Sequence, residues 1–273
     1  MNVEDWEPPA VVRDQHGVGH VNNATFSAVH GFRPLMLDLH LPVGRGPYPV
    51  LVYVHGGAWF SGSRLGLPPT VDRVDFHSRV LARGYAIAEV DYRLSAEAAY
   101  PAPLDDLLEA LQWLSFWSPK LGLDPARLAL LGESAGAHLA LMAAFTEPTL
   151  VAAVIDWYGP VDLVRAIETS PVELAEDPAV QLLGGVGPDL LERAATASPL
   201  GHVHADCPPV ICIHGTADLA VPYADSVSLT AALGRLGVRS ELLPVAGAGH
   251  IFEGCSDLGA LIEAGLDFLA RTV

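Results

Sequence analysis

The sequence predicts one domain of the α/β class, with a mostly parallel sheet and helices on both of its faces. Short apolar runs that are typical of buried strands alternate along the chain with segments of helical periodicity. This alternation favours parallel strands joined by right-handed helical crossovers. The chain has 273 residues, of which 51% are hydrophobic and 17% are charged, so it can bury a large core. Because no internal repeat or linker interrupts the pattern, we expect a single domain over residues 1–273.

The N-terminal part of the chain predicts an irregular arm followed by one antiparallel strand. Residues 1–31 carry scattered prolines and glycines, and we expect them to form an arm outside the sheet. Over residues 34–41, leucine occupies every second position, which is the pattern of a half-buried antiparallel strand. A turn rich in proline and glycine, residues 42–47, then leads to a strand that is apolar throughout.

The first of the later strands, over residues 49–54, is apolar throughout, as expected for a strand that helices cover on both sides. The later strands are predicted over residues 49–54, 85–91, 128–132, 151–157, 209–215 and 239–245. Helices are predicted from the spacing of apolar residues over about residues 70–83, 102–118, 138–144, 223–236 and 256–270. Residues 160–208 are longer and richer in proline and glycine than a plain crossover, which indicates a functional segment, a small cap or lid insert.

Composition and charge restrict the partners of the protein. The formal net charge is -17, from 32 acidic and 15 basic residues, which argues against nucleic acid and anionic membranes as partners. The pattern of the first residues predicts no signal peptide, and no apolar run has the length of a membrane span. The cysteines lack metal-binding spacing, so we expect reduced thiols in a cytoplasmic protein: Cys207, Cys212 and Cys255. The oligomeric state stays open, with a homodimer among the candidates.

The chain is organised around residues 132–136, Gly-Glu-Ser-Ala-Gly, which lie between a predicted strand and a predicted helix. In that context, Gly-x-Ser-x-Gly predicts a nucleophile elbow, a turn so sharp that its serine holds a strained backbone. The glycines keep side chains away from the neighbouring strand and helix, and the start of the helix points its N–H groups toward the serine. Ser134 is therefore the candidate nucleophile. The alternative is a bystander serine in a glycine-rich turn.

The partners of this serine can also be assigned from the sequence. A serine hydroxyl needs a base within hydrogen-bonding reach, and the base needs an orienting carboxylate. The chain supplies them in the order Ser134, Asp218, His250, and each follows the end of a predicted strand, the edge where sites form in parallel sheets. Taken singly, Asp218 could be a turn or helix-capping residue, and His250 a surface histidine. Asp156 and Asp162 are the reserve candidates for the acid.

The other histidines are interpreted as structural. His55 and His214 each end a predicted strand, but neither has the chain position expected of the base, and His55 is expected to hold its loop by hydrogen bonding. Two pairs of histidines have spacings that a metal site could use: His16 with His20, and His202 with His204. Since no third ligand accompanies either pair, no metal is predicted.

Attack on a carbonyl group creates an oxyanion, which positioned N–H donors must stabilise. Ala135 offers one N–H at the start of the helix, directly after the candidate nucleophile. Residues 55–59, His-Gly-Gly-Ala-Trp, follow a strand and supply the others, because glycine lets the backbone turn its N–H groups inward. We expect Gly57 and Ala58 to be these donors, and Trp59 to provide packing or a pocket wall.

Eight stretches of the sequence resemble those of a known protein family. They are residues 55–59, 91–94, 132–136, 158–163, 182–185, 198–200, 214–218 and 247–250. By these motifs the chain resembles the hormone-sensitive-lipase-like carboxylesterases and the related BD-FAE group of the α/β-hydrolase superfamily. The resemblance runs from about residue 34 to the C-terminus and leaves out residues 1–31. It implies an α/β-hydrolase fold with a sheet of the eight-stranded type.

The residues and the resemblance together predict hydrolysis of small carboxylic esters through an acyl-enzyme on Ser134, without a cofactor. Where the lipase-like esterases usually have a third glycine, this chain has Ala58, which is closer to the His-Gly-Gly-x-Trp pattern of kynurenine formamidases. An amidase or arylformamidase with the same triad is therefore the alternative enzyme. The alternative of another class is a ligand-binding protein on an inactive hydrolase scaffold. The plant gibberellin receptors are similar to such a protein. Such receptors lose a triad member, whereas this chain has all three.

Overall fold

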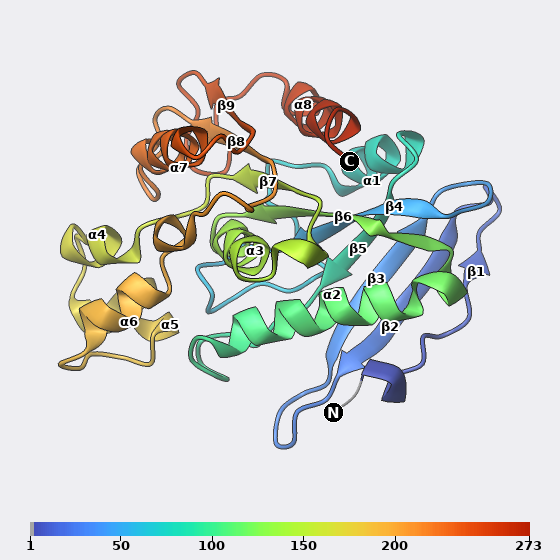
Figure 1. Cartoon of the computed structure of the whole chain (residues 1–273), viewed down its shortest axis with the longest axis horizontal. Helices are drawn as coiled ribbons and strands as arrows, with labels where there is room; N and C mark the ends of the chain where they lie inside the picture. Colours follow the sequence, from blue (N-terminus) through green and yellow to red (C-terminus); the bar gives the residue numbers. More distant parts are fainter. Residues whose placement is uncertain (1–2) are drawn as a thin grey trace.

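The computed structural model, which describes residues 3–273, has a nine-stranded sheet at its centre (Figure 1). Six adjacent strands, β5-β4-β6-β7-β8-β9, are parallel, and β1, β2 and β3 extend one edge as antiparallel strands. The predicted α/β class and mostly parallel sheet are confirmed. The strands are β1 (Val12–Arg13), β2 (Gly19–Ser27), β3 (Leu35–Leu41), β4 (Tyr48–Val54), β5 (Ala86–Val90), β6 (Leu123–Glu133), β7 (Ala153–Trp157), β8 (Val210–Gly215) and β9 (Ser240–Val245).

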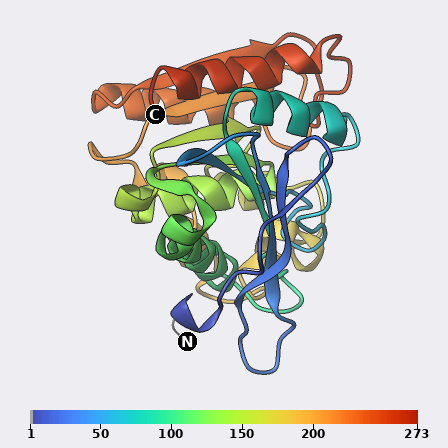
Figure 2. The same ribbon diagram turned by 90° about the vertical axis from the view of Figure 1, so that its right-hand side faces the viewer.

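Helices cover both faces of the sheet, as the sequence predicted. Helices α1 and α8 pack on one face and lie side by side, teal and red at the top of Figure 2, whereas α2, α3 and α7 pack on the other face. The α-helices are α1 (Arg73–Ala82), α2 (Ala102–Leu121), α3 (Ala135–Thr146), α4 (Leu163–Glu168), α5 (Pro178–Leu182), α6 (Leu190–Thr196), α7 (Ala224–Arg235) and α8 (Leu258–Ala270). Short 3-10 helices are η1 (Val3–Asp5), η2 (Pro148–Leu150), η3 (Leu174–Glu176) and η4 (Pro199–His202). No helix within residues 3–273 is both long and apolar enough to cross a membrane.

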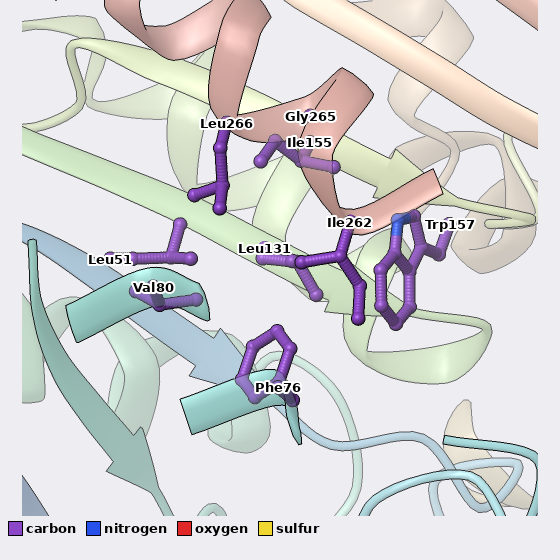
Figure 3. A pocket seen from close by; sticks show the side chains of 9 residues that line it. All are labelled: Leu51, Phe76, Val80, Leu131, Ile155, Trp157, Ile262, Gly265 and Leu266. Atoms are coloured by element: carbon purple, nitrogen blue, oxygen red, sulfur yellow. The ribbon is translucent and has the colours of Figure 1, made fainter. Parts of the chain in front are cut away.

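The contact between α1, α8 and the sheet is a dry apolar layer (Figure 3). Phe76 and Val80 project from α1, and Ile262 and Leu266 project from α8, toward strand side chains such as Ile155. The space between them holds no room for a water molecule. Close packing of this kind makes each methylene group count toward stability. The layer fixes α1 against β4 and β5, on the side of the sheet opposite α2 and α3.

The prediction of an irregular arm over residues 1–31 is wrong for its second half. Residues 19–27 form β2, which pairs with β3 in antiparallel register and is joined at its outer edge by β1. Val21, Ala24 and Phe26 are buried in the core. Two shifts of register interrupt the β2–β3 pairing, between Val21 and Ala24 and between Thr25 and Ser27. Because each irregularity breaks the period-two pattern, the strand is hidden in the sequence.

The insert at residues 160–208 folds into short helices rather than one long crossover. Helices α4, α5 and α6 lie together at one end of the molecule (Figure 1), with η3 against α5, while η4 lies against α3 and α7. Asp162 and Asp177 are the N-cap residues that directly precede α4 and α5. Each side chain accepts a hydrogen bond from a backbone N–H of the first turn. The spacing of His202 and His204 is also that of residues on one face of a strand, but neither lies on a strand, since His202 ends η4 and His204 follows it outside any helix or strand.

Candidate active site

Ser134 occupies the sharp turn that its motif predicted. Strand β6 ends at Glu133 and helix α3 begins at Ala135, so a single residue separates the two elements. Ser134 has φ 51° and ψ -117°, a strained conformation for a residue with a side chain. Its N–H donates to the carbonyl of Trp157 at 2.8 Å, which ties the turn to β7. A Cβ at Gly136 would collide with the carbonyl of the β4 residue Val54, so only glycine permits this approach.

His250 lies between Ser134 and Asp218. Its Nε2 is 2.9 Å from Ser134 Oγ, and its Nδ1 is 2.7 Å from Asp218 Oδ2. The two residues come from loops that follow adjacent strands, since β8 ends at Gly215 and β9 ends at Val245. The structure thus brings together the three side chains that the sequence singled out. A neutral imidazole that donates from Nδ1 to a carboxylate has its Nε2 lone pair free to accept the serine proton.

The Asp218 carboxylate is fully buried and strongly held. Its Oδ1 accepts from the N–H groups of Ala220 and Val221 at 2.8 and 2.9 Å, and its Oδ2 faces two histidines. Burial acts to raise the pKa of Asp218, but hydrogen bonds from His214 and His250 lower it well below its usual range. Asp218 is therefore ionised at neutral pH and can stabilise a positive charge on the imidazole of His250.

His214 is a second histidine at Asp218, a contact that the sequence interpretation did not foresee. It is completely buried, and it was interpreted only as structural. Its Nε2 lies 3.0 Å from Asp218 Oδ2, and its Nδ1 lies 2.8 Å from Ser226 Oγ. The available signal was the position of His214 at the end of β8, four residues before the acid in the same loop. Asp218 therefore has a histidine on either side.

The loop at residues 55–59 lies beside Ser134 in an unusual backbone conformation. Gly57, Ala58 and Trp59 have φ of 109°, 51° and 61°, which is the left-handed region that favours glycine. Within residues 3–273, no protein acceptor takes the N–H of Gly57, Ala58 or Ala135. All three residues line the same cavity as Ser134. As predicted, His55 holds the loop, since its Nδ1 lies 2.8 Å from the carbonyl of Gly56.

Glu133, the variable residue of the Gly-Glu-Ser-Ala-Gly motif, holds the loop at residues 55–59 by a hydrogen bond. Its Oε1 accepts from the N–H of Gly56 at 2.9 Å and from the Tyr53 hydroxyl at 3.1 Å, and its Oε2 accepts from the Tyr158 hydroxyl at 3.1 Å. Burial raises the pKa of Glu133, and these hydrogen bonds partly offset the effect. Sequence analysis assigned no role to this side chain, because its partners come from two distant segments, one at the end of β4 and one after β7.

A cavity of about 750 Å³ opens beside Ser134 and His250. The insert supplies one wall, including Leu163, Ala166 and Val172. Trp59 also lines the cavity, in agreement with its predicted role as packing or pocket wall, and its Nε1 donates to Nδ1 of the buried His138 at 3.2 Å. The volume is that of a site for a small molecule.

The reserve candidates for the acid are occupied elsewhere. Asp156 is completely buried, and its Oδ1 accepts from the N–H of Gly159 at 2.8 Å. Asp162 caps α4 by accepting from the N–H of Arg165 at 3.0 Å. The carboxylate within hydrogen-bonding distance of His250 is that of Asp218.

A mostly parallel sheet with a serine elbow after β6 and facing aspartate and histidine loops is the α/β-hydrolase fold. The BD-FAE family model matches residues 37–233, most of the chain, and the chain belongs to the BD-FAE family. Esterase LipC of Mycobacterium tuberculosis is 31% identical over 227 residues, which cover 76% of this chain and 54% of that protein. The chain thus spans about half the length of the curated relatives it matches first.

Solved structures share the fold over almost the whole chain. A truncated carbohydrate esterase from gut microbiota has a TM-score of 0.81 at 24% identity, covering 97% of this chain and 99% of that one. A propionate-bound thermophilic esterase from the planctomycete Thermogutta terrifontis has a TM-score of 0.73 at 26% identity, covering 92% of this chain and 93% of that one. At 24% identity, the likeness to the carbohydrate esterase is evidence for a shared fold alone.

Proposed function

We propose that the protein is a serine carboxylesterase that hydrolyses small carboxylic esters through an acyl-enzyme on Ser134. The observation that carries the proposal is the position of His250, 2.9 Å from Ser134 Oγ on one side and 2.7 Å from Asp218 Oδ2 on the other. Nucleophilic acyl transfer requires a hydroxyl, a base and an orienting carboxylate in this order. The esterase names of LipC and of the Thermogutta protein support the same activity.

The mechanism uses side chains and backbone groups of the chain itself. His250 Nε2 takes the proton of Ser134 Oγ as the oxygen attacks the carbonyl carbon, and Asp218 stabilises the resulting imidazolium. The N–H groups of Gly57, Ala58 and Ala135 hold the oxyanion of the tetrahedral intermediate. When this intermediate collapses, the alcohol leaves with the proton from His250. Water then attacks the acyl-enzyme, gives a proton to His250, and releases the carboxylic acid as Ser134 regains its proton.

The substrates we propose are esters with short acyl groups. The apolar residues Leu163, Ala166 and Val172 of the insert line the cavity and would contact the acyl or alcohol group. The bound propionate of the Thermogutta esterase, a three-carbon acid, supports a short acyl group. In this proposal residues 160–208 act as a small cap on the single α/β-hydrolase domain.

Initial rates on a series of p-nitrophenyl esters test this proposal. Acetate and butyrate should be turned over faster than octanoate and laurate, and N-formylkynurenine should be turned over more slowly than the short esters. Formamide turnover well above the ester rates would replace the ester assignment by an arylformamidase. No turnover of any substrate would favour the ligand-binding scaffold. The Ser134→Ala protein is the blank for every substrate.

The remaining partners are proposed from charge and composition. A net charge of -17 supports a neutral small molecule rather than nucleic acid as partner. The cysteines are free thiols, which supports a reducing, cytoplasmic environment: Cys207, Cys212 and Cys255. The homodimer stays a prediction, and its test is the molar mass in solution.

A further inference from the structure

A second group of histidines around a carboxylate lies on the α1 side of the sheet. His40 of β3 and His77 of α1 both direct Nε2 at Glu89 of β5, at 3.2 and 3.1 Å. The register of the strands produces part of this contact: His40 pairs with Ile87, so Glu89 is its diagonal neighbour on the same face. The Glu89 side chain is fully buried, while those of His40 and His77 are 14% and 17% exposed. None of these residues lines the cavity beside Ser134.

We propose that His40, His77 and Glu89 bind a divalent transition-metal ion of the Zn²⁺ class. Their ligand atoms, one ring nitrogen from each histidine and a carboxylate oxygen, lie within 4.8 Å of one another. Small side-chain rotations would bring all three to about 2.0–2.2 Å from one ion. Two imidazoles and one carboxylate suit Zn²⁺ and leave a position for water. Mg²⁺ and Ca²⁺ prefer oxygen ligands and fit this donor set poorly.

The hydrogen bonds behind His40 favour a ligand role. His40 Nδ1 lies 3.0 Å from Nδ1 of His20, and His20 Nε2 lies 3.4 Å from Asp14 Oδ2. If His40 donates from Nδ1, neutral His20 accepts on Nδ1 and donates from Nε2 to the carboxylate. In this arrangement, which the group can adopt when an ion replaces the hydrogen bond from His40 to Glu89, Nε2 of His40 carries no proton and is free for a metal. A histidine ligand usually donates its other ring N–H to a carboxylate, a carbonyl or water, and here His20 would accept that hydrogen bond and donate in turn to Asp14.

Arg73 holds the position that the ion would take over. Its Nη2 lies 2.6 Å from Glu89 Oε2, and its other terminal nitrogen bonds to the carbonyl of Leu65. The Glu89 carboxylate is thus already paired with a cation at the place that the proposed ion would occupy. Since the Arg73 side chain is one-third exposed, it can leave when an ion binds.

The role of such an ion would be structural. The ligands belong to β3, β5 and α1, so one ion would join a helix to two strands that are far apart in the sequence. Binding to the folded state alone raises the melting temperature. The rise should be about 5 °C at a hundredfold excess of free Zn²⁺ over the dissociation constant.

Calorimetric titration of the EDTA-treated, dialysed 273-residue chain with ZnCl₂ in the presence of MgCl₂ tests the proposal. We expect one Zn²⁺ per chain with a Kd of about 10 µM or tighter. His77→Gln and His40→Gln should each weaken binding about 100-fold, and His20→Gln about 10-fold. Arg73→Gln should strengthen binding about 10-fold, because it removes the competing cation. The matched control is His30→Gln, an exposed histidine outside this group.

The comparison among these variants decides the proposal. A Kd weaker than about 10 µM for the unchanged protein overturns it, as does Zn²⁺ binding that survives both His77→Gln and His40→Gln. Loss of binding in His30→Gln to the same extent also overturns it, because that pattern indicates adventitious surface binding. The melting temperature of each variant in EDTA shows that it is folded. Should one ligand variant not fold, the other and Arg73→Gln, with its opposite sign, still decide the question.

Discussion

Two buried carboxylates, Asp218 and Glu89, each contact two histidines. They differ in whether one of those histidines also contacts a hydroxyl group. Asp218 lies between His214 and His250, at 3.0 and 2.7 Å. Glu89 lies between a histidine of β3 and one of α1, at 3.2 and 3.1 Å. In both groups burial acts to raise the pKa of the carboxyl, and hydrogen bonds from the two histidines outweigh it and lower the pKa.

The orientation of the imidazole rings separates the two groups. His250 gives Nδ1 to the carboxylate and turns Nε2 to Ser134, at the wall of a cavity. The histidines at Glu89 both turn Nε2 toward the carboxylate itself, beside Arg73. The hydroxyl of Ser134 is therefore within reach of a base in the first group, while in the second both Nε2 atoms and Arg73 meet at one carboxylate. The same side-chain types serve as base or ligand according to which ring nitrogen is free.

The largest expected effect is that of Ser134→Ala. Removing the hydroxyl leaves His250 with no nucleophile to activate, so the ester rate should fall by about 10⁴-fold or more. The alanine fits the same turn, and the melting temperature should stay within about 2 °C of that of the unchanged protein. Initial rates on p-nitrophenyl acetate, with a melting curve for each protein, measure both quantities. Ester turnover that persists in the variant would show that Ser134, His250 and Asp218 do not carry out the reaction.

Asp218→Asn should have the next largest effect, about 10³- to 10⁴-fold in kcat. An amide cannot stabilise the imidazolium of His250, and it favours the wrong tautomer of the ring. The matched control is Asp156→Asn, a buried carboxylate that bonds to the N–H of Gly159, which should change kcat by less than about threefold. Near-normal rates for Asp218→Asn would transfer the role of the acid to Asp156 or Asp162.

The first group could be predicted from sequence because its signals are local. A strand, five motif residues and a helix define the turn at Ser134, and the other two residues follow the ends of strands whose apolar pattern is plain. Parallel strands place such loops at one edge of the sheet, so the order along the chain was enough to bring Ser134, Asp218 and His250 together. The sheet and the main helices were predictable from the same periodicities.

The second group has no local signal. His40 lies on the face of β3 that alternation alone marks as polar, and its partners come from α1 and β5, 37 and 49 residues away. Its supporting residue His20 lies in β2, which irregular register hid from the sequence analysis. Glu133 escaped notice for the same reason, since its partners converge only in the folded chain. Contacts between side chains on neighbouring strands can be predicted only when the register that pairs those strands is known.

Glu89→Gln should show that the second group acts on stability. The folded-state pKa of Glu89 is lowered from 4.5 to about 2, so its contribution is present above about pH 4.5 and is lost as the pH falls toward 2. The variant should lose on the order of 3 kcal/mol of unfolding free energy at pH 7, and much less near pH 3. Urea unfolding in EDTA at both pH values measures this difference. An equal loss at both pH values would show that packing, rather than charge, is responsible.

The control for this stability measurement is Glu263→Gln. Glu263 forms ion pairs with Arg79 and Arg83 between α8 and α1 and is about one-third exposed. Exposed pairs of this kind contribute about 1 kcal/mol or less. A loss as large as that of Glu89→Gln would contradict the distinction between buried and exposed carboxylates on this face.

The smallest effect we predict concerns His214, the second histidine at Asp218. His214→Phe keeps a buried ring but removes the donor 3.0 Å from Asp218 Oδ2, so the carboxylate is held less firmly for His250. We expect kcat to fall about 10-fold with KM nearly unchanged, because the contact acts through Asp218 and touches no substrate. His214→Gln can still donate a hydrogen bond and should recover most of the rate. If both variants lose the same rate, the hydrogen bond from His214 does not contribute to catalysis, and His214 supports Asp218 through packing alone.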